Sequence, residues 1–160
     1  MQRAQYEFAT NLDLSMTIIL AAMGFEAELS RLHHKWQLLA AWDKAIDIAS
    51  EKLDELLRKH PNIKEKINAV AALMHPSGLD DFVNGQADVR QVVAEGYPSL
   101  AGKPLADGIQ RALFWPRNAI VHMGRIASER EEAVRALNVA RLGVYVLDRM
   151  DEIKRNATAV

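Results

Sequence analysis

Residues 128–155 read SEREEAVRALNVARLGVYVLDRMDEIKR, and this stretch indicates the fold class of the chain most firmly. Its apolar residues recur at steps of three and four, which is the spacing of an amphipathic helix. Ser128 followed three residues later by Glu131 fits a capping box and predicts the helix start. Lys154 and Arg155 complement the helix dipole near its end. The stripe that we expect to be buried consists of Ala133, Leu137, Ala140, Val144, Leu147 and Met150.

A second long helix is predicted near the N-terminus, after a short polar lead-in. Asp13 is a suitable N-cap for it. Its apolar stripe consists of Leu14, Ile18, Ala21, Phe25, Leu29, Leu32 and Trp36. A further stripe from Trp42 to Leu57 continues the pattern, and His60-Pro61 ends it, because the residue before a proline avoids helical geometry.

Shorter helices are expected over residues 63–74, 88–95 and from about Pro104 onward. Pro116 breaks or kinks the last of these and suits the first position of a new helical turn. No alternation of period two predicts a strand. The chain is therefore expected to form one all-α helical bundle over residues 1–160, with its core at about 14–155 and long first and last helices.

The composition limits the classes of protein. The chain has no cysteine, which excludes disulfides and thiolate metal sites. Its longest apolar run, Ile18 to Phe25, is far shorter than the ~20 residues of a membrane span. We therefore expect a cytoplasmic protein that does not contact a membrane. The net charge of −1 argues against a protein that binds nucleic acid by bulk electrostatics, although it permits an RNA substrate.

The residues best suited to chemistry lie in the stretch Pro116–Gly124, which contains Arg117, Asn118 and His122. Arginine is a permanent cation whose planar fork suits phosphate, and histidine exchanges protons near neutral pH. Positions 117 and 122 are ~140° apart around a helix, whereas positions 118 and 122 share a face. We therefore expect Asn118 to contact His122, and Arg117 to share a site with His122 chiefly where two chains face each other.

Arg117-Asn118-Ala119-Ile120-Val121-His122 resembles the Arg-polar-x-x-x-His signature of HEPN domains, which are small all-α proteins. Many members of that family are metal-independent ribonucleases that act as symmetric dimers, often in toxin–antitoxin or phage-defence systems. The resemblance implies that Arg117 and His122 form the catalytic pair and that Asn118 is the polar residue beside the arginine. It also implies an RNA substrate, a homodimer and an antitoxin or regulatory partner, without a cofactor or metal.

One departure from that family concerns Gly124. Toxins that pair with small nucleotidyltransferase antitoxins resemble this chain but carry a tyrosine at this position, so control by nucleotide transfer onto that tyrosine is not expected here. Other family members lack activity. The alternative interpretation is therefore a catalytically inactive HEPN dimer that binds a protein or a nucleotide, and a plain helical interaction module is a third.

The remaining candidates are weaker. His33 and His34 are adjacent and diverge on a helix, and no other histidine spacing suits a metal. Packing is the expected role of Trp36 and Trp42, whereas Trp115, beside the motif, suits either packing or base stacking. Glu26 and Glu28 are expected on a solvated face, with assistance to the site as the alternative for both acids.

Overall fold

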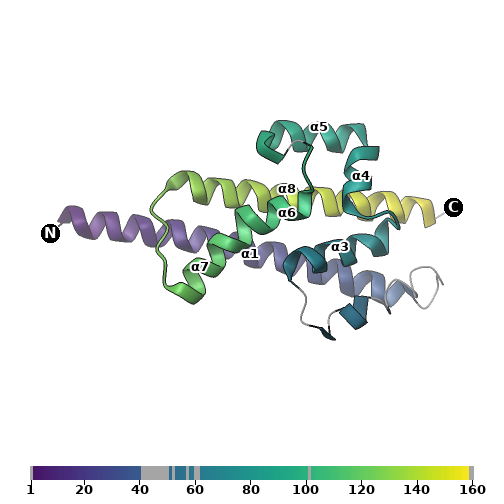
Figure 1. The fold of residues 1–160 in the computed structure, drawn as a ribbon, viewed down its shortest axis with the longest axis horizontal. Coiled ribbons are helices and arrows are strands. Elements are labelled where there is room, and N and C mark those ends of the chain that lie inside the picture. The colour runs from purple at the N-terminus through teal and green to yellow at the C-terminus, as the bar shows by residue number, and fades with distance from the viewer. Residues whose placement is uncertain are drawn as a thin grey trace.

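The computed structural model describes residues 2–40, 51, 53–56, 58, 59, 62–100 and 102–158, and every regular element among them is helical (Figure 1). The all-α prediction is therefore confirmed for this part of the chain. Trp42, His60 and most of the predicted 42–57 stripe lie outside the described residues. In chain order the elements are α1 (Gln2–Ala40), α3 (Ile63–Met74), α4 (Leu79–Gly85), α5 (Ala87–Gly96), the 3₁₀ turn η1 (Pro98–Leu100), α6 (Leu105–Ile109), the π-helical turn η2 (Gln110–Phe114), α7 (Trp115–Met123) and α8 (Arg130–Thr158).

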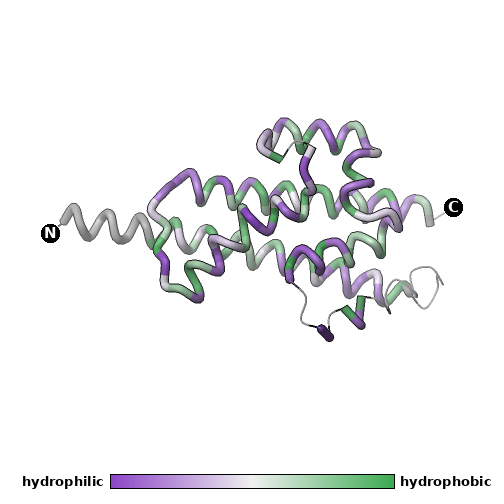
Figure 2. Tube along the Cα trace, viewed as in Figure 1, coloured by the Kyte–Doolittle hydropathy of each residue, from purple (hydrophilic) through white to green (hydrophobic). Residues whose placement is uncertain are grey.

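The two long helices α1 and α8 run side by side in the same direction and are the central pair of the bundle (Figure 1). Apolar and polar residues are interspersed along the coloured parts of both helices (Figure 2). Phe25 of α1 is buried against Gly143 of α8, where an added Cβ would lie 2.6 Å from the phenylalanine ring. Glycine at position 143 therefore permits the close approach of the two helices.

Most of the predicted stripes are buried, with two corrections. In α1 the stripe residues from Ile18 to Trp36 are all buried. Helix α1 begins at Gln2, so Asp13 lies inside the helix and is not its N-cap. Asp in a helix interior costs only a few tenths of a kcal/mol, which is too little to stop a helix. In α8, Leu137 is exposed, and Ala136, Val139 and Val146 are buried instead, because α8 contacts several helices besides α1.

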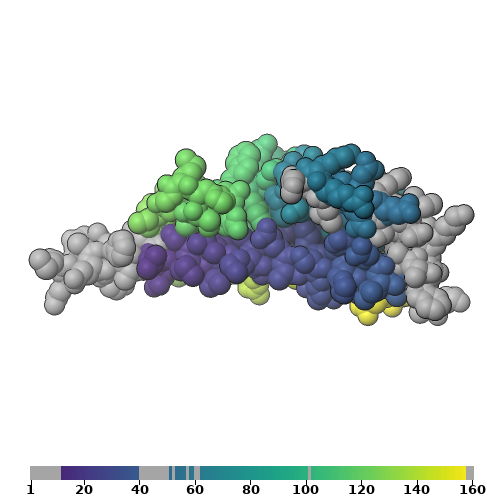
Figure 3. All heavy atoms as spheres, turned by 90° about the horizontal axis from the view of Figure 1, so that it is seen from below, coloured from purple at the N-terminus to yellow at the C-terminus, as the bar shows by residue number. Residues whose placement is uncertain are grey.

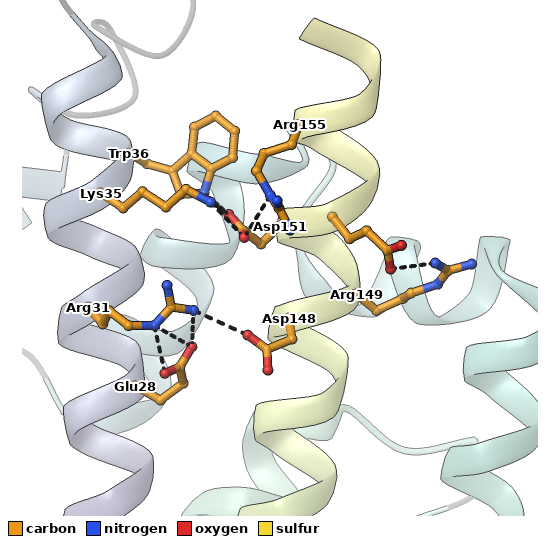
Figure 4. Close-up of polar contacts among 9 residues, drawn as sticks. Glu28, Arg31, Lys35, Trp36, Asp148, Arg149, Asp151 and Arg155 are labelled. Carbon is orange, nitrogen blue, oxygen red and sulfur yellow. Dashed lines mark hydrogen bonds and ion pairs between the residues drawn. The ribbon is translucent and has the colours of Figure 1, made fainter. Parts of the chain in front are cut away.

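A buried carboxylate joins the C-terminal halves of α1 and α8 (Figure 4). Asp151 is only 4% exposed. It accepts hydrogen bonds from Lys35 Nζ at 2.5 Å and Trp36 Nε1 at 2.9 Å, and Arg155 Nε lies 3.2 Å away. These three donors supply the compensation that a buried charge needs.

A second polar cluster lies one turn earlier on the same two helices. Arg31 pairs with Glu28 on its own helix and with Asp148 of α8 at 3.2 Å (Figure 4). The hydrogen bond from Arg31 lowers the pKa of Glu28. Burial, together with the nearby Glu28, raises the pKa of Asp148. The cluster thus contains one carboxyl group that favours ionisation and one that resists it.

The shorter helices cover one side of this pair. In Figure 3, α7, the α6–η2 segment and α3 lie in a row above α1. Helix α3 has the predicted bounds and begins with a capping box between Asn62 and Glu65. The helix predicted over 88–95 is confirmed as α5, whereas the short helix α4 was not predicted.

Helices α6 and α7 are joined through a π-helical turn rather than by a break. Within η2 the Trp115 amide donates to the carbonyl of Gln110, five residues earlier. Pro116 follows at the start of α7 and has no amide hydrogen, so the usual four-residue bond cannot form there. The predicted kink at Pro116 is therefore present as a widened turn. Phe114 on this turn packs edge-on against Phe25 of α1, with 6.1 Å between ring centres.

None of the helices in the described residues combines the length and the apolar character that crossing a membrane requires.

Candidate active site

Gly124 ends helix α7 at its C-terminus. This glycine has φ +65°, a left-handed conformation that ends the helix one residue after Met123. The amides of Gly124 and Arg125 both donate to the carbonyl of Ala119. The following loop is held to α1, because the Ala127 amide donates to the buried Ser15 hydroxyl at 2.9 Å. His122 therefore lies on a helix end that is anchored on both sides.

All three residues of the motif line one hollow of about 350 Å³ between α7, α1 and the start of α3. His122 and Asn118 are exposed, and Arg117 is half-buried. Glu26 from α1 and Lys66 from α3 also line this hollow, which we call the site hollow. The hollow therefore places a guanidinium, an ammonium group and an imidazole around one space open to solvent.

Arg117 and His122 both line the site hollow within one chain, although they diverge around the helix. Their helical separation is unchanged, but Asn118 lies between them on the wheel and the hollow spans the whole arc. Arg117 Nη1 donates to Asn118 Oδ1 at 2.9 Å. The long arginine side chain therefore turns toward the hollow. Asn118 thus has Arg117 as its hydrogen-bond partner, and no hydrogen bond joins it to His122 in the part of the chain that the structure describes.

Within the part of the chain that the structure describes, one donor of Arg117 lacks a partner. Its Nε is buried and makes no hydrogen bond within the described residues. A buried donor left unpaired costs about 1–3 kcal/mol. A ligand can complete the hydrogen bonding of such a group, and an anionic oxygen is the natural acceptor for a guanidinium.

Several residues of the site hollow were not found from the sequence. Lys66, Asn62 and Gln110 line it, and nothing in their local pattern indicates this role. They reach the hollow only because α3 packs beside α7. Glu26 lines the site hollow, which is one of the two positions considered for it from the sequence. Glu28 instead forms an ion pair with Arg31.

The two tryptophans Trp36 and Trp115 differ in their burial. Trp36 is buried, as predicted, and donates to Asp151. Trp115 is 57% exposed and lines the site hollow, with the Arg111 guanidinium 5.8 Å from its ring centre. Its exposure favours a contact role over core packing.

The other described histidines lie away from the motif. His33 is half-buried, and burial lowers its pKa, although Asp54 Oδ1 lies 3.9 Å from its Nε2. His75 ends α3 and packs edge-on against Phe82, with 5.6 Å between ring centres. These surroundings point to structural roles.

Comparison of this chain with protein-family models, with curated proteins and with solved structures finds no match.

Proposed function

We propose that this protein is a metal-independent endoribonuclease of the HEPN type. The observation that carries the proposal is the gathering of Arg117, Asn118 and His122 around one solvent-open hollow. The second support is the buried Nε of Arg117, which has no acceptor among the described residues, whereas a phosphate would supply an anionic one. By resemblance, the setting is a toxin–antitoxin or phage-defence system in the cytoplasm, with an antitoxin or regulatory protein as a partner.

The chemistry uses the substrate's own 2′-hydroxyl. His122 accepts the proton of this hydroxyl, O2′ attacks the phosphorus, and the bond to O5′ breaks. The leaving O5′ takes up a proton, so the products are a 2′,3′-cyclic phosphate and a 5′-hydroxyl end. Arg117 binds the non-bridging oxygens and stabilises the charge that develops on them. Asn118 acts as a positioning residue, because it holds the Arg117 fork.

A homodimer is part of the proposal. Val121, Met123 and Ile126 are exposed apolar residues within four positions of His122, and Met123 is 81% exposed. An apolar patch beside a polar site is typical of a surface that another polypeptide covers. A second copy packed on this patch would bring two His122 side chains together, so that one serves as base and the other as acid.

The decisive experiment incubates the purified full-length chain with end-labelled RNA in the presence of EDTA. The parent is expected to cleave and to leave 2′,3′-cyclic phosphate ends. His122→Ala and Arg117→Ala are each expected to lower the rate by at least about 10²-fold. His34→Ala, which changes an exposed histidine outside the site hollow, is the matched control and should retain the parent rate.

Cleavage that persists in both site variants would contradict the assignment and indicate a contaminating nuclease. A parent that binds RNA or a nucleotide but never cleaves it would favour the inactive HEPN dimer. Sedimentation of the parent and of Met123→Glu tests the dimer separately. If the parent is monomeric and still cleaves RNA, the proposed site formed by two His122 side chains of a homodimer is wrong.

A further inference from the structure

Two further hollows are lined by residues of the α6–η2 segment, of the η1 region and of the first part of α8. The first, of about 360 Å³, is lined by Tyr97, Lys103, Arg111 and Arg135 among others. The second, of about 400 Å³, shares Tyr97 and Arg135 with the first and adds Arg130. Arg111 connects the first of these hollows to the site hollow, because its guanidinium lies over Trp115. The Arg111–Trp115 contact therefore places the first further hollow beside the site hollow, and the two further hollows share lining residues with each other.

The surface around the three hollows is basic in a chain whose net charge is −1. Three acidic residues line the three hollows, and one of them, Asp107, is paired with Lys64 at 2.5 Å. Six Lys and Arg side chains line the same hollows, namely Lys66, Lys103, Arg111, Arg117, Arg130 and Arg135.

Among the described residues, the cations of the two further hollows differ in their ion pairs from those that join α1 and α8. Lys103, Arg111, Arg130 and Arg135 form no ion pair in the part of the chain that the structure describes. By contrast, the cations that join α1 and α8 bind carboxylates. A row of cations without carboxylate partners is available to phosphates.

Two aromatic side chains lie along the same surface. Trp115 is exposed and lines the site hollow, and Arg111, which lines the first further hollow, lies over its ring. Tyr97 is half-buried and lines both further hollows. Aromatic rings placed between cations are the arrangement by which proteins bind single-stranded nucleic acid, since bases stack on the rings while phosphates meet the cations.

We infer that a single strand of RNA lies along this surface, which we call the basic track, from the site hollow past Trp115 to Arg130. This inference rests on the proposed ribonuclease function and adds a substrate class to it. The strand places the scissile phosphate at Arg117 and stacks a neighbouring base on Trp115. A duplex does not fit this description, because its bases are stacked on each other and cannot reach the aromatic rings.

The test measures binding of a fluorescent single-stranded oligoribonucleotide to the full chain carrying His122→Ala, in EDTA, at several salt concentrations. The double variant Arg111→Gln/Arg135→Gln removes two cations of the basic track. It is expected to weaken binding about tenfold or more and to lower the salt slope by about 1.4, at ~0.7 for each phosphate contact. Trp115→Ala is expected to weaken binding about tenfold, whereas Trp115→Phe retains most of the affinity.

The matched control is Arg58→Gln/Arg141→Gln, which removes two exposed cations that line none of the three hollows. This double variant should bind like the His122→Ala parent. Equal losses in the two double variants would overturn the track, and so would a duplex of the same sequence that binds as tightly as the single strand. Poly-glutamate that binds as tightly as the RNA would instead assign the surface to an acidic protein partner.

Failure of the track and failure of the ribonuclease function give different results. If the unmodified chain cleaves RNA but the track variants bind normally, the function stands and the track is wrong. If the track variants lose binding but the unmodified chain never cleaves, the track stands as an RNA-binding surface and the ribonuclease proposal is wrong.

Discussion

Arg117 donates a hydrogen bond from Nη1 to Oδ1 of Asn118 at a distance of 2.9 Å. The two residues are neighbours in sequence, so this contact needs no second helix. Its effect is to hold one arm of the guanidinium while the buried Nε has no partner among the described residues. This hydrogen bond links Asn118 to the arginine of the site.

This contact predicts the effect of changing Asn118. In Asn118→Ala the arginine fork loses its support, and misplacement of a binding group by a small distance is costly in catalysis. We expect the rate of RNA cleavage to fall about tenfold, less than in Arg117→Ala, with little change in thermal stability because Asn118 is exposed. Single-turnover cleavage beside a melting curve measures both effects. An Asn118→Ala rate as low as that of His122→Ala would mean that Asn118 acts directly in the reaction.

The buried carboxylate of Asp151 predicts a large loss of stability on substitution. Asp151→Ala leaves Lys35 and the Trp36 indole without their acceptor, and breaking a buried ion pair costs about 3–5 kcal/mol. Because Lys35 is 28% exposed and regains some hydration, we expect about 3 kcal/mol. Urea unfolding measures the change. Glu152→Ala, which changes the exposed neighbour, should cost less than about 1 kcal/mol.

The two helical glycines of the long helices predict opposite effects of the same substitution. Gly143→Ala places a methyl group against the buried Phe25 ring, and overpacking of this kind costs about 1–3 kcal/mol. Gly24→Ala in α1 meets nothing within 4 Å and is expected to stabilise the protein by about 0.5–1 kcal/mol. Thermal or urea unfolding of the two variants provides the comparison. Stabilisation by Gly143→Ala would show that α1 and α8 pack less closely than described.

The Glu28–Asp148 pair predicts a dependence of stability on pH. The raised pKa of Asp148 gives a stabilising contribution that is complete below its unfolded pKa and is lost as the pH rises through its folded pKa. The lowered pKa of Glu28 gives a contribution that is present above its unfolded pKa and is lost as the pH falls through its folded pKa.

Asp148→Asn removes a carboxyl group whose ionisation is unfavourable in the folded protein. We expect this variant to match or exceed the parent Tm at pH 7, by at most about 2 °C because the group is half exposed. The difference should shrink as the pH falls toward the ordinary aspartate value of 3.8. Glu28→Gln should lower the Tm at neutral pH, because it removes the carboxylate that Arg31 binds. A Tm lowered equally by both variants at pH 7 would contradict the assigned directions.

Much of the fold follows from local pattern. The stripe from Ile18 to Trp36, the bounds of α3 and the widened turn at Pro116 all arise from residues close in sequence. The errors lie where distant segments decide burial. Leu137 is exposed although its spacing suits the stripe of α8, because the buried face of α8 depends on which helices contact it.

By itself the sequence determined that the chain is helical, where most of its helices lie, and that Arg117, Asn118 and His122 occur together before the last long helix. These properties depend on side-chain periodicity and on proline and glycine geometry, which act over a few residues. Only the tertiary structure decided that the three residues border one hollow, that Lys66 and Glu26 join them, and that Arg111 of a second hollow lies over Trp115. The reason is physical: helix periodicity sets the direction of a side chain from its own axis, whereas its neighbours are set by the packing of helices far apart in sequence.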